Sequence, residues 1–521
     1  MRVPLPRSSG ILLHLTSLPG PLATGGMGSA AFAFIDWLHS TGQTWWQTLP
    51  TGMIDLCNSP YLSLSSRAGN PWLIDPEALV ARGWIEPDLW QSVSTRTPQD
   101  QLHRSDYSIG VAQRRELLEA AQRGFNARAT PGERNRFSGF VRREHRWLSD
   151  FALFMTLHEQ HSAQAWTFWT DWRDAALRRR EPDALARAKV EHAEAIAFWC
   201  FTQWLFFEQW AQLRSYANER GVRLVGDLPF YPAYHSAEVW CRPDLFDLDE
   251  DGLQLTLGGV PPDANGRNGQ CWGSVTYRWQ NHVLEGFEWW CERVGNALAR
   301  CDLLRLDHFR ALHGFWAINA KTAEPADGAW RPAPGAQLLL KIDQVFDSPP
   351  LFVEDLGYVT AEVTLLRQRF RLPGVSVAQY GFAAGRPNNA YLPTQAGADM
   401  VLYTGTFDNN TTAGWFASDD GVNRPFFDRY FDGASAGKNA ADDAPAVAAH
   451  LMARAVLMSG AGLAILPMQD VLQLGAEARM NIPGQAFGCW EWRMRATDLT
   501  PAHSARLAEW TWLGNRVMDA P

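Results

Sequence analysis

Short apolar runs of strand length alternate along the chain with stretches whose apolar residues recur at helical spacing. The first runs are Gly10–Leu18 and Thr44–Pro50, and Ala30–Ser40 between them is predicted as a helix that ends before Gly42. A strand, a helix and a second strand in this order predict a βαβ unit with parallel pairing. Six further runs are predicted as strands: Arg223–Phe230, a run that starts at Leu303, Leu351–Gly357, Val375–Phe382, Met400–Asn409 and Leu463–Leu472.

Two long segments interrupt this alternation. Between the second and third predicted strands the apolar spacing is helical, most clearly over Glu191–Glu219, which ends before Gly221. Between the third and fourth, Tyr231–Trp279 is rich in Gly, Pro and Asp and is predicted as loop, followed by a helix at about Asn281–Ala299.

These elements predict one (β/α)8 (TIM) barrel over residues 1–521. It would carry a mostly helical insertion at 51–222 and a loop-rich insertion at 231–300. An open doubly wound sheet is the alternative fold. The absence of a GxGxxG or phosphate-loop pattern after any predicted strand weakens that alternative, because the fold usually binds nucleotides through such turns.

Composition narrows the possible partners. The net charge of −9 and the pI near 5.8 argue against a nucleic-acid or anionic-membrane partner. No run of 18 apolar residues predicts a transmembrane helix and no clear signal peptide is present, so we expect a cytoplasmic location. The 7 cysteines are scattered without a CxxC pair, which suggests neither a zinc site nor a disulfide framework. The 25 tryptophans are expected mostly in the core, with some offering flat apolar faces to sugar rings.

Acidic residues stand at the ends of five predicted strands. They are Asp227, Asp307, Glu354, Asp408 and Asp470. In a parallel barrel all strand C-termini lie on one face, so several of these carboxyl groups should converge on one mouth. Carboxyl groups that lie close together raise one another's pKa.

Convergent carboxyl groups serve two main chemistries, binding of a hard metal ion and cleavage of a glycosidic bond. Arg305, two residues before Asp307, would keep Asp307 ionised, although an ion pair with a purely structural role explains this stretch equally well. The apolar run Leu351–Val353 before Glu354 favours a neutral acid. One charged and one neutral carboxyl group, together with the tryptophan content, favour sugar chemistry.

Many short motifs follow one another in a single order. They are S-G-I-L-L-H-L-T-S-L-P-G (Ser9–Gly20), S-P-Y (Ser59–Tyr61), A-G-N-P (Ala68–Pro71), G-D-L-P (Gly226–Pro229), G-V-P-P-D (Gly259–Asp263), G-Q-C-W-G (Gly269–Gly273), R-L-D-H-F-R (Arg305–Arg310), E-D-L-G (Glu354–Gly357), T-G-T-F-D-N-N-T (Thr404–Thr411), Q-D (Gln469–Asp470), R-M-N-I-P-G (Arg479–Gly484) and W-E-W-R (Trp490–Arg493). In these motifs the chain resembles the amylomaltases (4-alpha-glucanotransferases, or disproportionating enzymes) of glycoside hydrolase family 77 from end to end.

The resemblance implies a retaining transferase that moves α-1,4-glucan segments between maltooligosaccharides, on a barrel without a C-terminal β-sandwich and without a cofactor or metal ion. Asp307 matches the family nucleophile, Glu354 the acid/base and Asp408 the third carboxylate at the cleavage subsite. Residues that match the lining of that subsite are Tyr61, Asp227, Arg305 and His308, and Trp272 matches the loop that contacts glucan. Asp470 is expected to brace a loop. The resemblance leaves the oligomeric state open.

The chain departs from the family pattern near the expected substrate. Phe407 replaces a histidine, His235 an aspartate, Ala264 and Asn265 aromatic residues, and Ser274 and Cys489 asparagines. These departures predict a remodelled pocket, so an enzyme acting on a different α-glucoside or acceptor, as a transferase or a hydrolase, is an alternative. A catalytically silent glucan-binding protein is a second, and the three intact carboxyl groups count against it.

Overall fold

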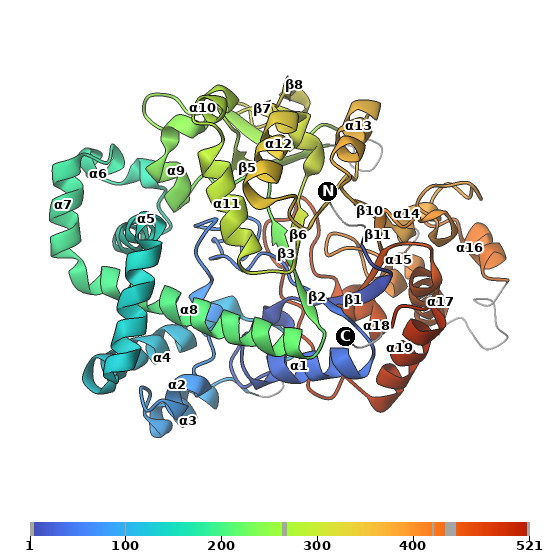
Figure 1. The fold of residues 1–521 in the computed structure, drawn as a ribbon, viewed down its shortest axis with the longest axis horizontal. Coiled ribbons are helices and arrows are strands. Elements are labelled where there is room, and N and C mark those ends of the chain that lie inside the picture. The colour runs from blue at the N-terminus through green and yellow to red at the C-terminus, as the bar shows by residue number, and fades with distance from the viewer. Residues whose placement is uncertain (1–4, 99–100, 263–267, 419–420, 433–443, 518–521) are drawn as a thin grey trace.

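The computed structural model describes residues 5–98, 101–262, 268–418, 421–432 and 444–517, and eight parallel strands form a closed barrel at its centre (Figure 1). Around the barrel the order is β1-β12-β11-β10-β9-β6-β3-β2. Their bounds are β1 (Ser8–Leu12), β2 (Trp45–Gln47), β3 (Arg223–Leu228), β6 (Leu303–Leu306), β9 (Leu351–Val353), β10 (Gly374–Val377), β11 (Met400–Tyr403) and β12 (Leu463–Pro467). Because β1 pairs with both β2 and β12, the sheet is closed, which confirms the predicted TIM barrel and excludes the open sheet.

Successive side chains along each strand point alternately to the inside and the outside of the barrel. Side chains that point inward form one buried cluster that includes Leu12, Val225, Leu303, Phe352 and Val401. The same cluster continues upward to Tyr61, Phe407 and Trp490 beyond the strand ends, so the barrel core and the mouth are packed as one body. Outward-facing apolar residues join the larger cluster under the helices.

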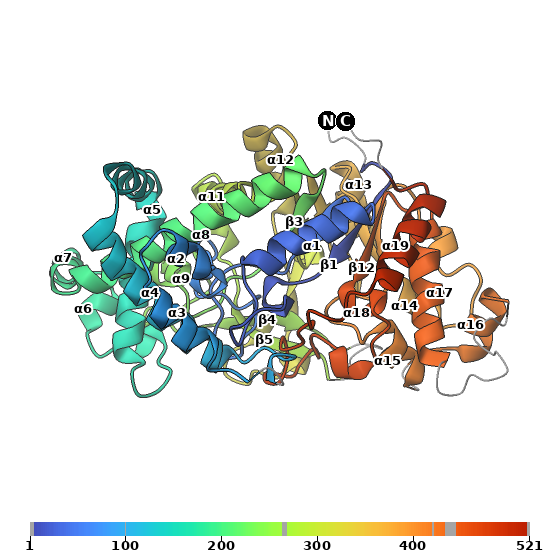
Figure 2. The same cartoon turned by 90° about the horizontal axis from the view of Figure 1, so that it is seen from below.

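The segment between β2 and β3 is built mainly from helices, which lie to one side of the barrel (Figures 1 and 2). They are α2 (Glu77–Ala81), α3 (Pro87–Ser94), α4 (Tyr107–Arg128), α5 (Pro131–His161), α6 (Ala175–Arg178), α7 (Pro182–Glu191) and α8 (Ala193–Glu219). Many of the tryptophans pack here, among them Trp84, Trp199 and Trp204, whose rings contact phenylalanines of α4 and α5. The boundaries 51–222 and 231–300 of the two insertions stay predictions.

The segment Tyr231–Trp279, which was predicted as loop, contains two strands, so the prediction is wrong there. A second, antiparallel sheet has the order β5-β4-β7-β8. Its strands are β4 (Thr256–Val260), β5 (Gln270–Val275), β7 (Gly314–Asn319) and β8 (Ala329–Pro332). Gly258 and Gly259 made β4 look like a turn, but here they allow close packing: a Cβ on Gly259 would lie 2.1 Å from the carbonyl oxygen of Gln270.

The helix expected over Asn281–Ala299 is two helices, α10 (Trp279–Leu284) and α11 (Glu288–Leu298), because Gly286 takes a positive φ of 65° between them. The remaining helices are α1 (Ser29–Ser40), α9 (Ala237–Cys241), α12 (Gly335–Phe346), α13 (Ala361–Arg369), α14 (Ala378–Gly381), α15 (Thr412–Ala417), α16 (Arg424–Tyr430), α17 (Ala444–Met458), α18 (Met468–Val471) and α19 (Pro501–Leu513). In the described chain after β12 we find helices and loops but no further strand. None of the described helices has the length and apolar character needed to cross a membrane.

Candidate active site

Asp307 and Glu354 leave the barrel from neighbouring strands at the same level. Leu306 at the end of β6 is in register with Val353 at the end of β9, and each acid is the next residue. The main-chain N–H of Glu354 donates to the carbonyl of Leu306 (2.9 Å), so the strand pairing continues up to the two acids. Both side chains therefore emerge together at the mouth, as predicted from the strand ends.

Glu354 sits in an environment that favours its neutral form. Its Oε2 accepts the main-chain N–H of His308 (2.9 Å) and its Oε1 that of Leu356 (3.1 Å), and these two hydrogen bonds lower its pKa, but burial outweighs them. Burial raises the pKa of Glu354 to about 8, and the charge of Asp307 adds to the rise, against the opposing charge of Arg305. The direction of this shift agrees with the neutral acid that the apolar run before Glu354 predicts.

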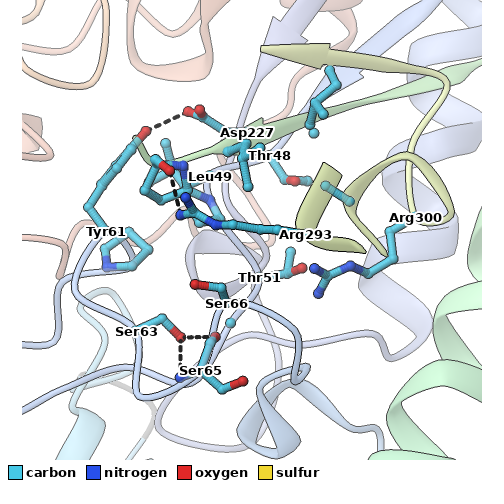
Figure 3. Close-up of a pocket in the computed structure, with 18 of the residues that line it drawn as sticks. Thr48, Leu49, Thr51, Tyr61, Ser63, Ser65, Ser66, Asp227, Arg293 and Arg300 are labelled. Atoms are coloured by element: carbon cyan, nitrogen blue, oxygen red, sulfur yellow. Dashed lines mark hydrogen bonds between the residues drawn. The ribbon is translucent and has the colours of Figure 1, made fainter. Parts of the chain in front are cut away.

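Arg305 is the central cation of the site. Its Nη1 lies 2.8 and 2.7 Å from the two carboxylate oxygens of Asp227 and 2.9 Å from Oδ1 of Asp307. Tyr61 donates its hydroxyl to Oδ2 of Asp227 (2.6 Å), and Figure 3 shows this bond at one end of a hollow whose lining also includes Arg293 and Arg300. The predicted Arg305–Asp307 ion pair thus exists, with Asp227 as a second partner.

Asp408 lies on the loop after β11 and belongs to the same electrostatic site. Burial raises its pKa to about 6, and the nearby charge of Asp307 also raises it. Asn481 donates to its Oδ1 (2.6 Å), and Arg479 donates to its main-chain carbonyl (2.9 Å). Sequence reasoning assigned no role to Asn481 or Arg479, although both lie in the R-M-N-I-P-G motif that carried part of the resemblance.

Phe407 joins two site residues by aromatic packing. Its ring stacks on Tyr61 with a centroid distance of 5.0 Å and an interplanar angle of 26°. The guanidinium of Arg305 lies 5.5 Å from the same ring, and Trp490 closes the cluster at 6.0 Å. With 7% of its surface exposed, Phe407 offers packing at the position where the family pattern has a hydrogen-bonding histidine.

His308 directly follows Asp307 in the turn after β6. The residue takes a left-handed conformation (φ 48°, ψ 47°), which turns the chain sharply as it leaves β6. Burial lowers its pKa to about 3, so the ring is neutral, and its buried Nε2 has no hydrogen-bond partner among the described residues. Trp272 meets the ring edge-on at 4.8 Å, so the structure brings the predicted Trp272 and His308 together.

Three of the departures lie in buried surroundings. His235 accepts the main-chain N–H of Trp169 at Nδ1 and pairs with His158 of α5 at 2.9 Å, so it is turned into the helical insertion. Ser274 and Cys489 are each 3% exposed. The expectation that His235 faces sugar is therefore wrong, whereas for Ser274 and Cys489 it stays a prediction. Ala264 and Asn265 lie outside the described residues.

Asp470 serves the packing of the loops, as expected. Its carboxyl group accepts hydrogen bonds from the hydroxyl of Thr404 and from both the main-chain N–H and the hydroxyl of Thr412 (2.7 Å each). These contacts tie the end of β11 and the start of α15 to α18.

Comparison with known proteins places the chain in a family. The model of the 4-alpha-glucanotransferases of glycoside hydrolase family 77 matches residues 13–499. The 4-alpha-glucanotransferase of Thermus thermophilus is 43% identical over 96% of this chain and 98% of its own, and that of Aquifex aeolicus 39% over 94% and 96%.

A solved structure agrees over the whole chain. The amylomaltase from Streptococcus agalactiae in complex with acarbose superposes with a TM-score of 0.91 at 34% identity, covering 98% of this chain and 99% of that one. The alignment includes the barrel and both segments that interrupt it. The chain therefore belongs to the 4-alpha-glucanotransferase family, glycoside hydrolase family 77.

Proposed function

We propose that this protein transfers α-1,4-glucan segments between maltooligosaccharides by a retaining double displacement. The observation that carries the proposal is the pair of unlike carboxyl groups: Glu354 with its pKa raised to about 8, and Asp307 in an ion pair with Arg305, on adjacent strand ends. Glycosidic bond cleavage with retention needs one neutral acid and one charged nucleophile. The names of the relatives support the same activity.

In the first step Glu354 gives its proton to the glycosidic oxygen while Asp307 attacks the anomeric carbon. The bond from that carbon to the leaving oxygen breaks and a covalent glycosyl–Asp307 ester forms, through an oxocarbenium-like transition state. The departing sugar leaves as an alcohol, and Glu354 becomes a carboxylate. This chemistry requires the two carboxyl groups to lie about 5–5.5 Å apart.

In the second step the Glu354 carboxylate removes the proton of an acceptor hydroxyl, whose oxygen attacks the anomeric carbon while the bond from that carbon to the Asp307 oxygen breaks. Asp307 is released as a carboxylate and Glu354 is again neutral, so protons and charges balance. Transfer exceeds hydrolysis when bound acceptor excludes water from this position. No metal ion or cofactor takes part in either step.

The other predicted residues would hold the sugar ring at the bond to be cleaved. Asp408, fixed by Asn481, and Asp227, fixed by Tyr61 and Arg305, present carboxylate oxygens to ring hydroxyls. His308 offers its unpartnered ring nitrogen, and Trp272 offers an aromatic face beside it. A neutral imidazole binds hydroxyls without bringing a positive charge near Glu354.

A second candidate function is favoured by Phe407. Its ring occupies a position in contact with Tyr61 and Arg305 and cannot donate a hydrogen bond, so a donor that lacks one hydroxyl would lose less here than in a site with histidine. The enzyme would then act on a different α-glucoside or acceptor. A cytoplasmic location, starch or glycogen as the natural substrate, and the absence of nucleic-acid or membrane partners remain proposals.

Incubation with maltotriose tests the proposal. We expect glucose together with a ladder of longer maltooligosaccharides, and no products from Asp307→Asn. Glucose and maltose without the ladder would indicate a hydrolase. No turnover by the wild-type protein, combined with maltodextrin binding that Asp307→Asn leaves intact, would indicate a glucan-binding protein. Screening deoxyglucosides as donors separates the second candidate function from the first.

A further inference from the structure

Arg310 is a buried cation without a polar partner. It lies in the turn after His308, its residue surface is 6% exposed, and its buried Nε and Nη1 have no hydrogen-bond acceptor among the described residues. No carboxylate of the described chain forms an ion pair with it. Buried donors without acceptors are unfavourable, so an arginine in this state indicates a group that the protein chain does not itself supply.

Two exposed aromatic rings accompany Arg310. The guanidinium lies 3.6 Å from the ring centre of Trp330 in β8 and 5.8 Å from that of Tyr358. The two rings stand nearly parallel, 23° apart in plane with centroids at 6.2 Å, and Trp330 is 40% exposed and Tyr358 60% exposed. Stacking on Trp330 orients the guanidinium and leaves its N–H groups without acceptors. Flat aromatic faces of this kind pack against the C–H faces of pyranose rings.

The platform formed by Arg310, Trp330 and Tyr358 takes two of its residues, Arg310 and Tyr358, from the turns that follow β6 and β9. Tyr358 lies four residues after Glu354 on the same loop, and Arg310 lies two residues after His308. The charge of Arg310 acts on His308 and on Tyr231, whose ring contacts Trp272. The groups that hold Asp307, namely Arg305, Asp227 and Tyr61, belong to a separate cluster in which every charge is paired.

We propose that Arg310, Trp330 and Tyr358 form a binding subsite for a neutral pyranose of the acceptor chain, beyond the sugar whose hydroxyl attacks. The sugar packs on the exposed aromatic faces, and its hydroxyl oxygens accept the N–H groups of Arg310. The assignment rests on the proposed transferase function, because only the second step of that reaction uses an acceptor. It goes further by naming which residues select acceptor length.

Acceptor kinetics test this subsite. A saturating maltotriose donor is combined with fluorescently labelled glucose or labelled maltotriose as acceptor. The initial rate at which labelled products form is measured. For Tyr358→Ala and Trp330→Ala we expect the KM of labelled maltotriose to rise about tenfold, which corresponds to losing one good aromatic contact. The KM of labelled glucose and the limiting rate should stay within twofold.

Two further variants control for structural effects. Tyr358→Phe keeps the ring and should retain wild-type acceptor KM. Trp512→Ala removes a 70% exposed tryptophan from α19, far along the chain from the platform, and should change nothing. Arg310→Lys keeps the charge but not the planar group, and should raise the KM for labelled maltotriose without lowering the unfolding midpoint.

The outcomes separate the two proposals. If the wild-type protein forms no labelled product, the transferase function fails. If it does, and Tyr358→Ala and Trp330→Ala leave the KM for labelled maltotriose unchanged, or change glucose and maltotriose equally, the subsite is disproved while the function stands. A response confined to a phosphorylated acceptor such as glucose 6-phosphate would overturn the assignment to a neutral sugar.

Discussion

Arg305 and Arg310 lie five residues apart, on either side of His308, and their surroundings are opposite. Arg305 is bound by the carboxylates of Asp227 and Asp307, and Asp227 in turn is held by Tyr61. Arg310 stacks on Trp330 and binds no carboxylate of the described chain. On the paired side, around Arg305, the charged groups have their partners without ligand, as expected of groups that must stay fixed during bond cleavage. On the unpaired side, around Arg310, N–H donors have no acceptor among the described residues, as expected of a surface that binds and releases a ligand.

The largest effect should come from removing the nucleophile on the paired side. Asp307→Asn should lower the rate of maltotriose disproportionation on the order of 10⁴-fold or more, because no covalent intermediate can form. The rate is measured as glucose release. Asp36→Asn, at an exposed acid paired with Arg220, is the matched control and should keep the wild-type rate. An Asp307→Asn protein with more than a hundredth of the wild-type rate would contradict the assignment.

Replacing the two arginines compares the two sides directly. Arg305→Met leaves the buried Asp227 carboxylate without its partner and should lower the free energy of unfolding by about 3–5 kcal/mol. Arg310→Met removes a cation–π contact but no hydrogen bond. It should change the free energy of unfolding by about 1 kcal/mol or less. Urea unfolding followed by fluorescence measures both. Equal losses would show that the two arginines do not differ in the way described.

The pH dependence of the reaction reports on Glu354. Since its pKa is raised to about 8, the proton needed for the first step is present below pH 8 and is lost as the pH rises through that value. We expect kcat/KM to fall about tenfold per pH unit above pH 8. Arg305→Met removes a charge that lowers this pKa, so the alkaline limb should move to higher pH, whereas Arg310→Met should leave it in place. A limb near pH 4.5 would refute the buried neutral acid.

The smallest effect should come from single hydroxyl groups. Tyr61→Phe removes the 2.6 Å hydrogen bond to Asp227 but keeps the stacking on Phe407, and should cost about 0.5–1.5 kcal/mol in transition-state binding. This corresponds to a loss of up to about tenfold in kcat/KM for the donor. Tyr358→Phe, on the unpaired side, is the matched variant and should leave donor kcat/KM unchanged. An equal loss in both variants would contradict the difference between the sides.

The barrel could be predicted from the sequence because its signal is local and repeated. Apolar runs of strand length recur along the chain, and an acid after Leu306 or Val353 is placed by the strand that precedes it. The antiparallel sheet was missed because Gly258 and Gly259 serve close packing, a need that arises only when β5 and Tyr231 lie against them. The strand or turn propensity of a short segment does not show where packing against distant residues requires a glycine.

The site residues that stand directly after strands could be predicted from the sequence. The contacts between residues far apart in the chain could not. Asn481 reaches Asp408 across 73 positions of the chain. Arg310, Trp330 and Tyr358 come from a turn, a strand of the second sheet and a loop, without a common spacing that could reveal them. His235 was misplaced for the same reason, since its partner His158 lies in α5.

The hydrogen bond from the main-chain N–H of His308 to Glu354 has a mechanical consequence. That N–H belongs to the same planar peptide unit as the carbonyl of Asp307, so one rigid group joins the backbone of the nucleophile to the carboxyl of the acid/base. Thermal motion of β6 or β9 carries both acids along together. The carboxyl group of Glu354 is thereby tied to the backbone of the nucleophile, while the carboxyl group of Asp307 is held in place by Arg305.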